Sequence, residues 1–180
     1  MLSLSNITNY KHVGDWFYIV TATILVDFVT IALAKYPGKD PYFKVNALND
    51  WYTKFGAVAV ASDVASILIG IAVARYIYTS MGLTNPLWFI PILLLFQLFH
   101  DLFFYVAVIT PIPKGHNQMI DVFKSYGQEN GQKILGADAL LMLSSVLVAS
   151  VLKSSPDHVT SATLLVSIYA ITYILYTKGG

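Results

Sequence analysis

The sequence of 180 residues contains no cysteine, and only 12% of its residues are charged. The absence of cysteine excludes disulfides, thiolate metal sites and thiol catalysis. A water-soluble domain carries about twice that share of charge, so the scarcity of charged residues excludes an ordinary soluble enzyme. The net charge of +1 offers no basic surface for nucleic acid, and we expect no nucleic-acid partner. These absences leave a polytopic membrane protein.

Long hydrophobic runs support this class. Hydrophobic residues make up 56% of the chain, and the mean hydropathy is +0.63. Stretches of this length cross a bilayer as helices, because helices satisfy their own backbone hydrogen bonds in lipid. The five stretches are 17–34, 55–74, 87–109, 134–152 and 159–176. We therefore predict an all-α integral membrane protein with five transmembrane helices, forming one membrane domain over residues 1–180.

The distribution of basic residues predicts the orientation, because cytoplasmic loops carry an excess of lysine and arginine. One side of the predicted bundle holds Lys11, Arg75 and Lys153. The other side holds Lys35, Lys39, Lys44, Lys54, Lys114, Lys124, Lys133 and Lys178. We therefore expect the N-terminus outside and the C-terminus in the cytoplasm.

Two loops on the predicted inner side have the pattern of short amphipathic helices. Residues 42–55 and 117–127 each place apolar side chains on one helical stripe. The stripes consist of Leu48, Trp51, Tyr52 and Phe55, and of Met119, Ile120, Phe123 and Tyr126. Such a helix either lies on the membrane surface or docks on the bundle, and the pattern leaves both alternatives open.

The chain also repeats itself. Asp27 and Pro37 recur as Asp101 and Pro111, and Trp51, Gly56 and Asp63 recur as Tyr126, Gly131 and Asp138. Asp27 and Pro37 lie 74 residues before their counterparts, and the other three residues lie 75 residues before theirs. We predict two parallel two-helix repeats, about 16–78 and 86–153, related by a pseudo-two-fold axis along the membrane normal. The stretch 159–176 is then an extra helix.

Acidic residues inside the predicted spans are the most informative feature. Four of the ten acidic residues lie there, namely Asp27, Asp63, Asp101 and Asp138, whereas every basic residue lies outside. A centrally placed aspartate costs about 2.5–3.5 kcal/mol to insert, so these side chains must face each other, water or a cation. Each lies about 6 to 12 Å from the inner end of its span, at 1.5 Å per residue. All four carboxylates are thus predicted in one layer of the inner leaflet.

Polar neighbours share faces with these acids at helical spacing. His100 is adjacent to Asp101 in sequence. The predicted supporting residues are Thr23, Thr30, Gln97, Tyr105 and Ser145, with Tyr173 from the fifth span at comparable depth. A row of small residues, Ser62, Ser66, Gly70 and Ala74, would let the second span pack closely against another helix or a second copy of the chain.

Three functions fit such a layer. Four carboxylates without a basic partner cannot all be ionised in a low dielectric, so some must hold a proton or a cation. We predict a proton- or cation-handling channel or transporter that uses Asp27, Asp63, His100, Asp101 and Asp138 and needs no cofactor. The alternative is a structural or scaffolding protein whose acids hold the helices together. A third possibility is a metalloenzyme with Asp and His ligands, although no motif assigns an enzymatic activity and we favour a non-enzymatic role.

Several stretches carry a family resemblance, namely 47–56, 74–78, 100–105 and 111–117. They resemble uncharacterised small multi-pass membrane proteins of large double-stranded DNA viruses that infect algae and protists. The resemblance implies a virion or host membrane, and it is compatible with both a structural role in the virion membrane and a channel-like role. It implies no particular activity and no site residues. From the residues themselves we expect the lipid bilayer as a partner, with a homo-oligomer allowed by the small-residue row and a bound cation allowed by the acids.

Overall fold

The computed structural model of the chain describes residues 6–36 and 46–177. This part is all-helical and contains no strand. The helices are α1 (Asp15–Lys35), α2 (Asn46–Phe55), α3 (Ala57–Ser80), η1 (Pro86–Trp88), α4 (Phe89–Phe104), η2 (Tyr105–Ile109), α5 (Gln118–Asn130), α6 (Lys133–Lys153) and α7 (Asp157–Ile174). Four predicted landmarks, Pro37, Lys39, Lys44 and Lys178, lie outside the described residues, as do the first residues of the predicted helix 42–55.

Four helices are long and apolar enough to cross a membrane. They are α1, α3, the continuous run Pro86–Ile109 and α6. Over the described residues, the expectation of an all-α protein with several helices long and apolar enough to span a membrane is therefore confirmed, and these four are called the spanning helices. In the described part of the chain, α7 is not among these four, so a fifth span stays a prediction.

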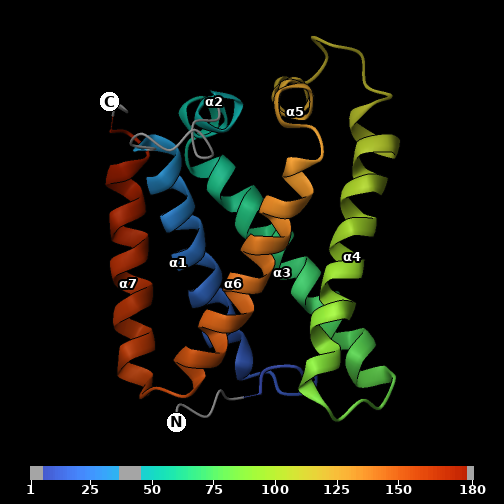
Figure 1. Cartoon of the computed structure of the whole chain (residues 1–180). Coiled ribbons are helices and arrows are strands. Elements are labelled where there is room, and N and C mark those ends of the chain that lie inside the picture. Colours follow the sequence, from blue (N-terminus) through green and yellow to red (C-terminus); the bar gives the residue numbers. More distant parts are fainter. Residues whose placement is uncertain (1–5, 37–45, 178–180) are drawn as a thin grey trace.

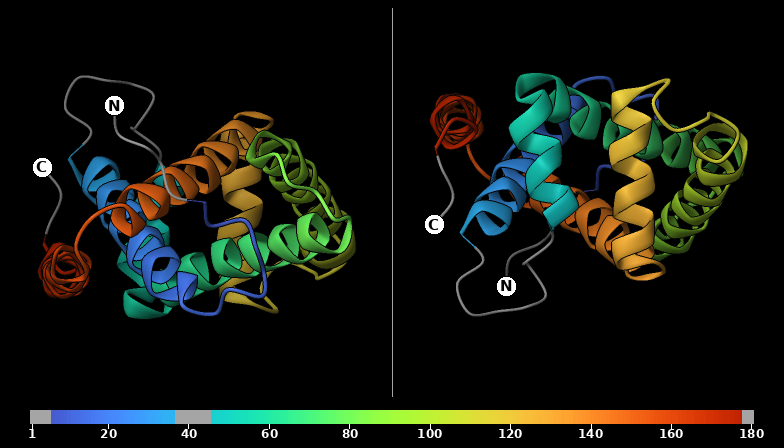
Figure 2. Two further views of the ribbon diagram at one scale, coloured as in Figure 1. Left: turned by 90° about the horizontal axis from the view of Figure 1, so that it is seen from below. Right: turned by 90° about the horizontal axis from the view of Figure 1, so that it is seen from above.

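The spanning helices form a bundle (Figure 1). The helix α1 packs against α6, α7 and α3, and α4 packs against α3 and α6. Seen along its axis, the bundle has α1, α3, α4 and α6 around its centre, with α7 on the outside (Figure 2). Side chains from these four helices therefore meet in one interior.

The short helices α2 and α5 lie side by side across one end of the bundle, which we call the cap end (Figures 1 and 2). Trp51 and Tyr52 of α2 are buried, as are Ile120 and Val122 of α5. The two helices also meet through the rings of Trp51 and Phe123, whose centroids are 4.8 Å apart. The amphipathic pattern left two alternatives open, the membrane surface or the bundle. In the structure both short helices dock on the bundle.

A glycine joins each of these short helices to the next spanning helix. Gly56 has φ 52° and ψ −125°, and Gly131 has φ 52° and ψ −129°. A positive φ is accessible to glycine at little cost, because glycine has no Cβ. The same sharp turn therefore leads from α2 into α3 and from α5 into α6.

The opposite end of the bundle, where α1 begins, is here called the far end. An apolar cluster fills this half and includes Ile19, Ile71, Leu93 and Met142. A second cluster surrounds α2 at the cap end. At Gly70 of the small-residue row, an added Cβ would collide with the Met142 side chain. The predicted close packing is therefore present between α3 and α6 at this point.

Candidate functional site

The first carboxylate, Asp27, lies deep in the bundle on α1. Its side chain is only 2% exposed. The Tyr52 hydroxyl of α2 donates a hydrogen bond of 3.3 Å to Asp27 Oδ1, whereas Asp27 Oδ2 is buried without a hydrogen-bond partner. Among the described residues, no ion pair involves Asp27. This carboxyl group is therefore buried with one neutral donor and no cation.

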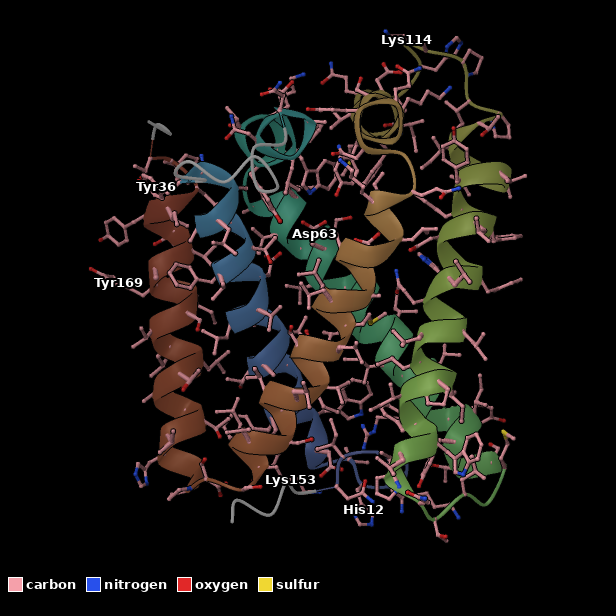
Figure 3. All side chains as sticks on the ribbon, viewed as in Figure 1. His12, Tyr36, Asp63, Lys114, Lys153 and Tyr169 are labelled. Carbon is pink, nitrogen blue, oxygen red and sulfur yellow. The ribbon has the colours of Figure 1, made fainter. Side chains whose placement is uncertain are left out.

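The second carboxylate, Asp63, lies on α3 beneath α2. The Trp51 indole Nε1 donates to both of its oxygens, at 3.1 and 3.0 Å. Figure 3 shows Asp63 inside the bundle, below the cap helices. Asp63 also interacts electrostatically with Asp27. Adjacent residues of α2 thus hold acids on two different spanning helices.

The third carboxylate, Asp101, lies on α4. Gln97 Nε2 donates to both Asp101 oxygens at 2.8 Å. His100 Nδ1 lies 3.2 Å from Asp101 Oδ1, and the imidazole stacks on Phe104 with ring centroids 5.9 Å apart. The His100 side chain is 39% exposed, so it forms the accessible edge of this group.

The fourth carboxylate, Asp138 on α6, connects the others. It interacts electrostatically with both Asp101 and Asp63. Asp27, Asp63, Asp138 and Asp101 therefore form a continuous series from four helices, which we call the carboxylate layer.

Tyr52, like Trp51, is a neutral donor to this layer from outside the spanning helices. Burial raises the pKa of Tyr52 well above its usual value, and the neighbouring carboxylates of Asp63 and Asp27 raise it further. Each of these effects disfavours the phenolate. Tyr52 therefore stays a hydrogen-bond donor even in alkaline solution.

The predicted supporting residues divide into two groups. Gln97 binds the layer directly, as described above, and Ser145 Oγ is buried without a hydrogen-bond partner. By contrast, the hydroxyls of Thr23 and Thr30 donate to backbone carbonyls of their own helix, at 2.9 and 3.0 Å. Tyr105 is half exposed. The two threonine hydroxyls are therefore occupied by backbone carbonyls and do not bind the carboxylates.

Tyr173 requires a correction. It is 61% exposed, and its hydroxyl donates to that of Tyr169 at 3.1 Å. Figure 3 shows Tyr169 pointing away from the bundle. Because α7 packs on the outside of α1, its tyrosine face is turned away from the interior. Tyr173 does not support the layer as the sequence pattern predicted.

A metal site was one of the predicted possibilities. Over residues 6–36 and 46–177, no group of three or more His, Asp or Glu side chains is arranged to hold a metal ion. A metalloenzyme with Asp and His ligands therefore has no preformed ligand set in this part of the chain.

The contacts of Trp51 and Tyr52 with the acids were not predicted from the sequence. Both residues lie on the apolar stripe of a predicted surface helix, and the pattern assigned neither of them to the acids. Their position could have indicated this role. Trp51 and Tyr52 are adjacent on a helix close to the predicted layer, and a buried indole N–H or phenol O–H usually finds a hydrogen-bond partner. Their partners on α1 and α3 could not be read from helical spacing, because the contacts lie between elements.

A second buried charge cluster lies at the far end. Arg75 is 0% exposed, and its Nη2 donates to Asp15 Oδ2 at 3.2 Å. Lys153 Nζ lies 2.6 Å from Asp15 Oδ1. The Arg75 guanidinium also lies over the Trp16 ring, at 5.0 Å from its centroid. We call Arg75, Asp15 and Lys153 the far-end ion cluster.

The predicted boundary of the second span was wrong at its far end. The hydropathy pattern predicted that this span ends at residue 74, with Arg75 outside it. In the structure α3 continues to Ser80, and Arg75 is buried within it. The pairing with Asp15 compensates the charge, which allows an arginine inside the helix bundle.

Comparisons of the chain with protein families, with curated proteins and with solved structures found no match. Function is therefore inferred from the residues themselves.

Proposed function

We propose that the chain is a multi-pass membrane protein that binds protons or small cations at the carboxylate layer and conducts or transports them. The observation that carries this proposal is Asp27. It is 2% exposed, it accepts one hydrogen bond from a neutral donor, and its second oxygen has no partner. An ionised carboxylate in this position would bear a large desolvation cost without a compensating charge. A proton or a bound cation supplies that charge.

The continuity of the layer supports exchange of that proton or cation. Asp63 is within electrostatic reach of Asp27, and Asp138 is within reach of Asp63 and Asp101. His100 adjoins Asp101 and is partly exposed. An imidazole ring can accept a proton at one nitrogen and donate one from the other. We propose His100 as the point where the layer exchanges protons with its surroundings.

The same proposal includes five spans arranged as two parallel repeats plus α7. The matching turns at Gly56 and Gly131 support the repeats, as does the position of Asp63 and Asp138 seven residues after each glycine. The pairing of α2 with α5 across the bundle is what a pseudo-two-fold axis would produce. The 18-residue helix α7 lies along α1 for most of its length (Figure 1) and is proposed as the fifth span.

The proposed orientation has the cap end in the cytoplasm. Figure 3 has Lys114 at the cap end and Lys153 at the far end. The resemblance to viral membrane proteins suggests a virion or host membrane. Because the chain lacks cysteine, Lys114→Cys and Lys11→Cys variants test the orientation in intact cells with an impermeant thiol reagent. We expect labelling of Lys11→Cys from outside and none of Lys114→Cys.

A structural role is the second candidate, and a specific observation favours it. Trp51 and Tyr52 hydrogen bond to Asp63 and Asp27, so the acids attach α2 to two spanning helices. In that role the carboxylates would act as acceptors for the cap and no ion would move. A flux measurement distinguishes this role from transport.

The test uses purified full-length protein in liposomes, with proton and cation flux as the readout. Asp27→Asn removes the ionisable group but keeps an oxygen that accepts from Tyr52, so the cap contact is retained. Asp50→Asn is the matched control, because Asp50 is exposed on α2 and outside the layer. Transport predicts flux in the wild type and the control that is lost in Asp27→Asn. No flux in the wild type would leave the structural role.

A further inference from the structure

The far end of the bundle carries a feature that the carboxylate layer does not explain. Residues 6–14, which precede α1, run across this end beside α3 and α6 (Figure 2). We propose that this segment is a strap that closes the far end, and that its release admits water into the far half of the bundle. The inference concerns closure alone, so it holds whether or not the layer transports ions.

One apolar side chain anchors the strap. Ile7 is 1% exposed and belongs to the same buried cluster as Ile19 and Ile71. Burying an isoleucine side chain stabilises the folded arrangement, because apolar surface is removed from water. Ile7 therefore occupies the mouth of the far half as part of the core.

Polar contacts anchor the strap to two spanning helices. Lys153 of α6 donates to the carbonyl of Asn6 at 2.7 Å. On α3, Thr79 Oγ1 accepts from the backbone N–H of Tyr10 at 2.9 Å. The strap thus bridges the ends of α3 and α6.

Arg75 is the main polar anchor. Its Nη2 donates to the carbonyls of Asn9 and His12, at 2.6 and 3.0 Å, in addition to Asp15. A single buried nitrogen therefore holds both the strap and the first turn of α1. This links strap attachment to the far-end ion cluster.

The apolar cluster that Ile7 joins contains small residues from three helices. Ala22 of α1, Ala74 of α3 and Ala149 of α6 are fully buried members of it. Small side chains let helices approach closely. Ile7 adds bulk to this cluster from outside the helices, so its departure leaves space that water can enter. A non-helical segment held by few anchors can detach locally while the helices stay folded.

A single-cysteine reporter tests the proposal, because the native chain has no cysteine. The reporter is Ala74→Cys, at a fully buried position that belongs to the same cluster as Ile7 and precedes Arg75. The measurement is its rate of labelling by an impermeant thiol reagent in nanodiscs. We expect Ile7→Ser to accelerate labelling on the order of tenfold, because opening of the strap becomes more frequent. The control reporter is Met81→Cys, which is exposed beyond the end of α3. Its labelling rate should not change.

A disulfide lock provides the second arm. Tyr10→Cys and Thr79→Cys replace two residues in direct contact, since the Tyr10 N–H donates to Thr79 Oγ1, and formation of the disulfide is verified by mass spectrometry. With Ile7 retained, the oxidised lock should slow labelling at Ala74→Cys relative to the reduced lock. Labelling is read at residue 74 by peptide mass spectrometry, because the reduced lock carries two further thiols, and no folding defect of Ile7→Ser affects this comparison. Equal rates in the oxidised and reduced states, or no acceleration by Ile7→Ser, would overturn the proposal.

Discussion

The two ends of the bundle bury ionisable groups in opposite ways. At the far end, Arg75 and Lys153 both contact Asp15, so opposite charges compensate each other. At the cap end, Asp27 and Asp63 accept hydrogen bonds from Tyr52 and Trp51, which carry no charge. Pairing explains why the far-end charges are tolerated. It does not explain the cap-end acids, and this difference is why a mobile proton or cation is proposed only there.

The two ends are also closed by different kinds of structure. Helices α2 and α5 cover the cap end, and their aromatic side chains reach the carboxylates (Figure 1). A non-helical segment covers the far end and is held mainly by Arg75, Lys153 and Ile7. Loss of one contact should therefore have larger consequences at the far end.

The largest expected effect comes from removing the buried cation. Arg75→Met should lower the free energy of unfolding by about 3–5 kcal/mol, because breaking a buried ion pair leaves unpaired polar groups behind. Asp27→Asn should cost less than about 1 kcal/mol, because asparagine still accepts from Tyr52 and no cation loses its partner. Denaturant unfolding in detergent micelles measures both. Equal losses would remove the contrast between the ends.

A smaller effect is expected from removing the indole donor at the cap. Trp51→Phe should lower the free energy of unfolding by about 1–3 kcal/mol, because both Asp63 oxygens lose a donor in a buried setting. Trp88→Phe is the matched control, since Trp88 is largely exposed. It should change stability by no more than about 0.5 kcal/mol. If both variants behaved alike, the Trp51 contact would not matter to the cap.

The phenol at the cap predicts a pH dependence. An unfolded tyrosine ionises near pH 10, whereas the pKa of Tyr52 in the folded protein is raised well above that by burial and by Asp63 and Asp27. The contribution of Tyr52 to the free energy of unfolding is thus complete below about pH 10 and is lost as the pH rises further. Above pH 10 the wild type should lose up to about 1.4 kcal/mol more per pH unit than Tyr52→Phe. Parallel stability profiles of the two proteins would contradict this.

The smallest effect is expected at the surface of the cap. Asp50 and Lys54 form an ion pair of 3.4 Å on α2, with side chains 57% and 56% exposed. Such pairs contribute little, so Lys54→Ala should change the free energy of unfolding by less than about 0.5 kcal/mol. A loss comparable to that of Arg75→Met would mean that burial is not what separates the two ends.

Much of the architecture could be predicted from the sequence. Hydropathy predicted the membrane-spanning helices, and the apolar stripes predicted two short helices that the structure contains as α2 and α5. The depth of Asp27, Asp63, Asp101 and Asp138 within their spans predicted that they would gather, and they do lie in a continuous series. A helix has a fixed rise and a fixed rotation per residue, so the depth of a side chain and the face on which it lies follow from its position in the sequence.

Other features could not be predicted from spacing. The burial of Arg75 depends on Asp15, which lies 60 residues earlier in the chain. Tyr173 shares a plausible depth with the layer, but the side on which α7 packs turns it outward. Whether α2 would lie on the membrane or dock on the bundle also depended on partners elsewhere in the chain.

The sequence by itself thus determined the class of protein, the spanning helices and the level of the acids along them. These follow from hydropathy and helical rise, which are local properties summed along the chain. The tertiary structure alone decided which buried charges meet a charged partner and which meet a neutral one. That choice depends on contacts between distant segments, since the energy of a buried charge is set by the groups around it. In this protein the far-end charges have partners of opposite charge, whereas the carboxylates beneath the cap meet neutral donors.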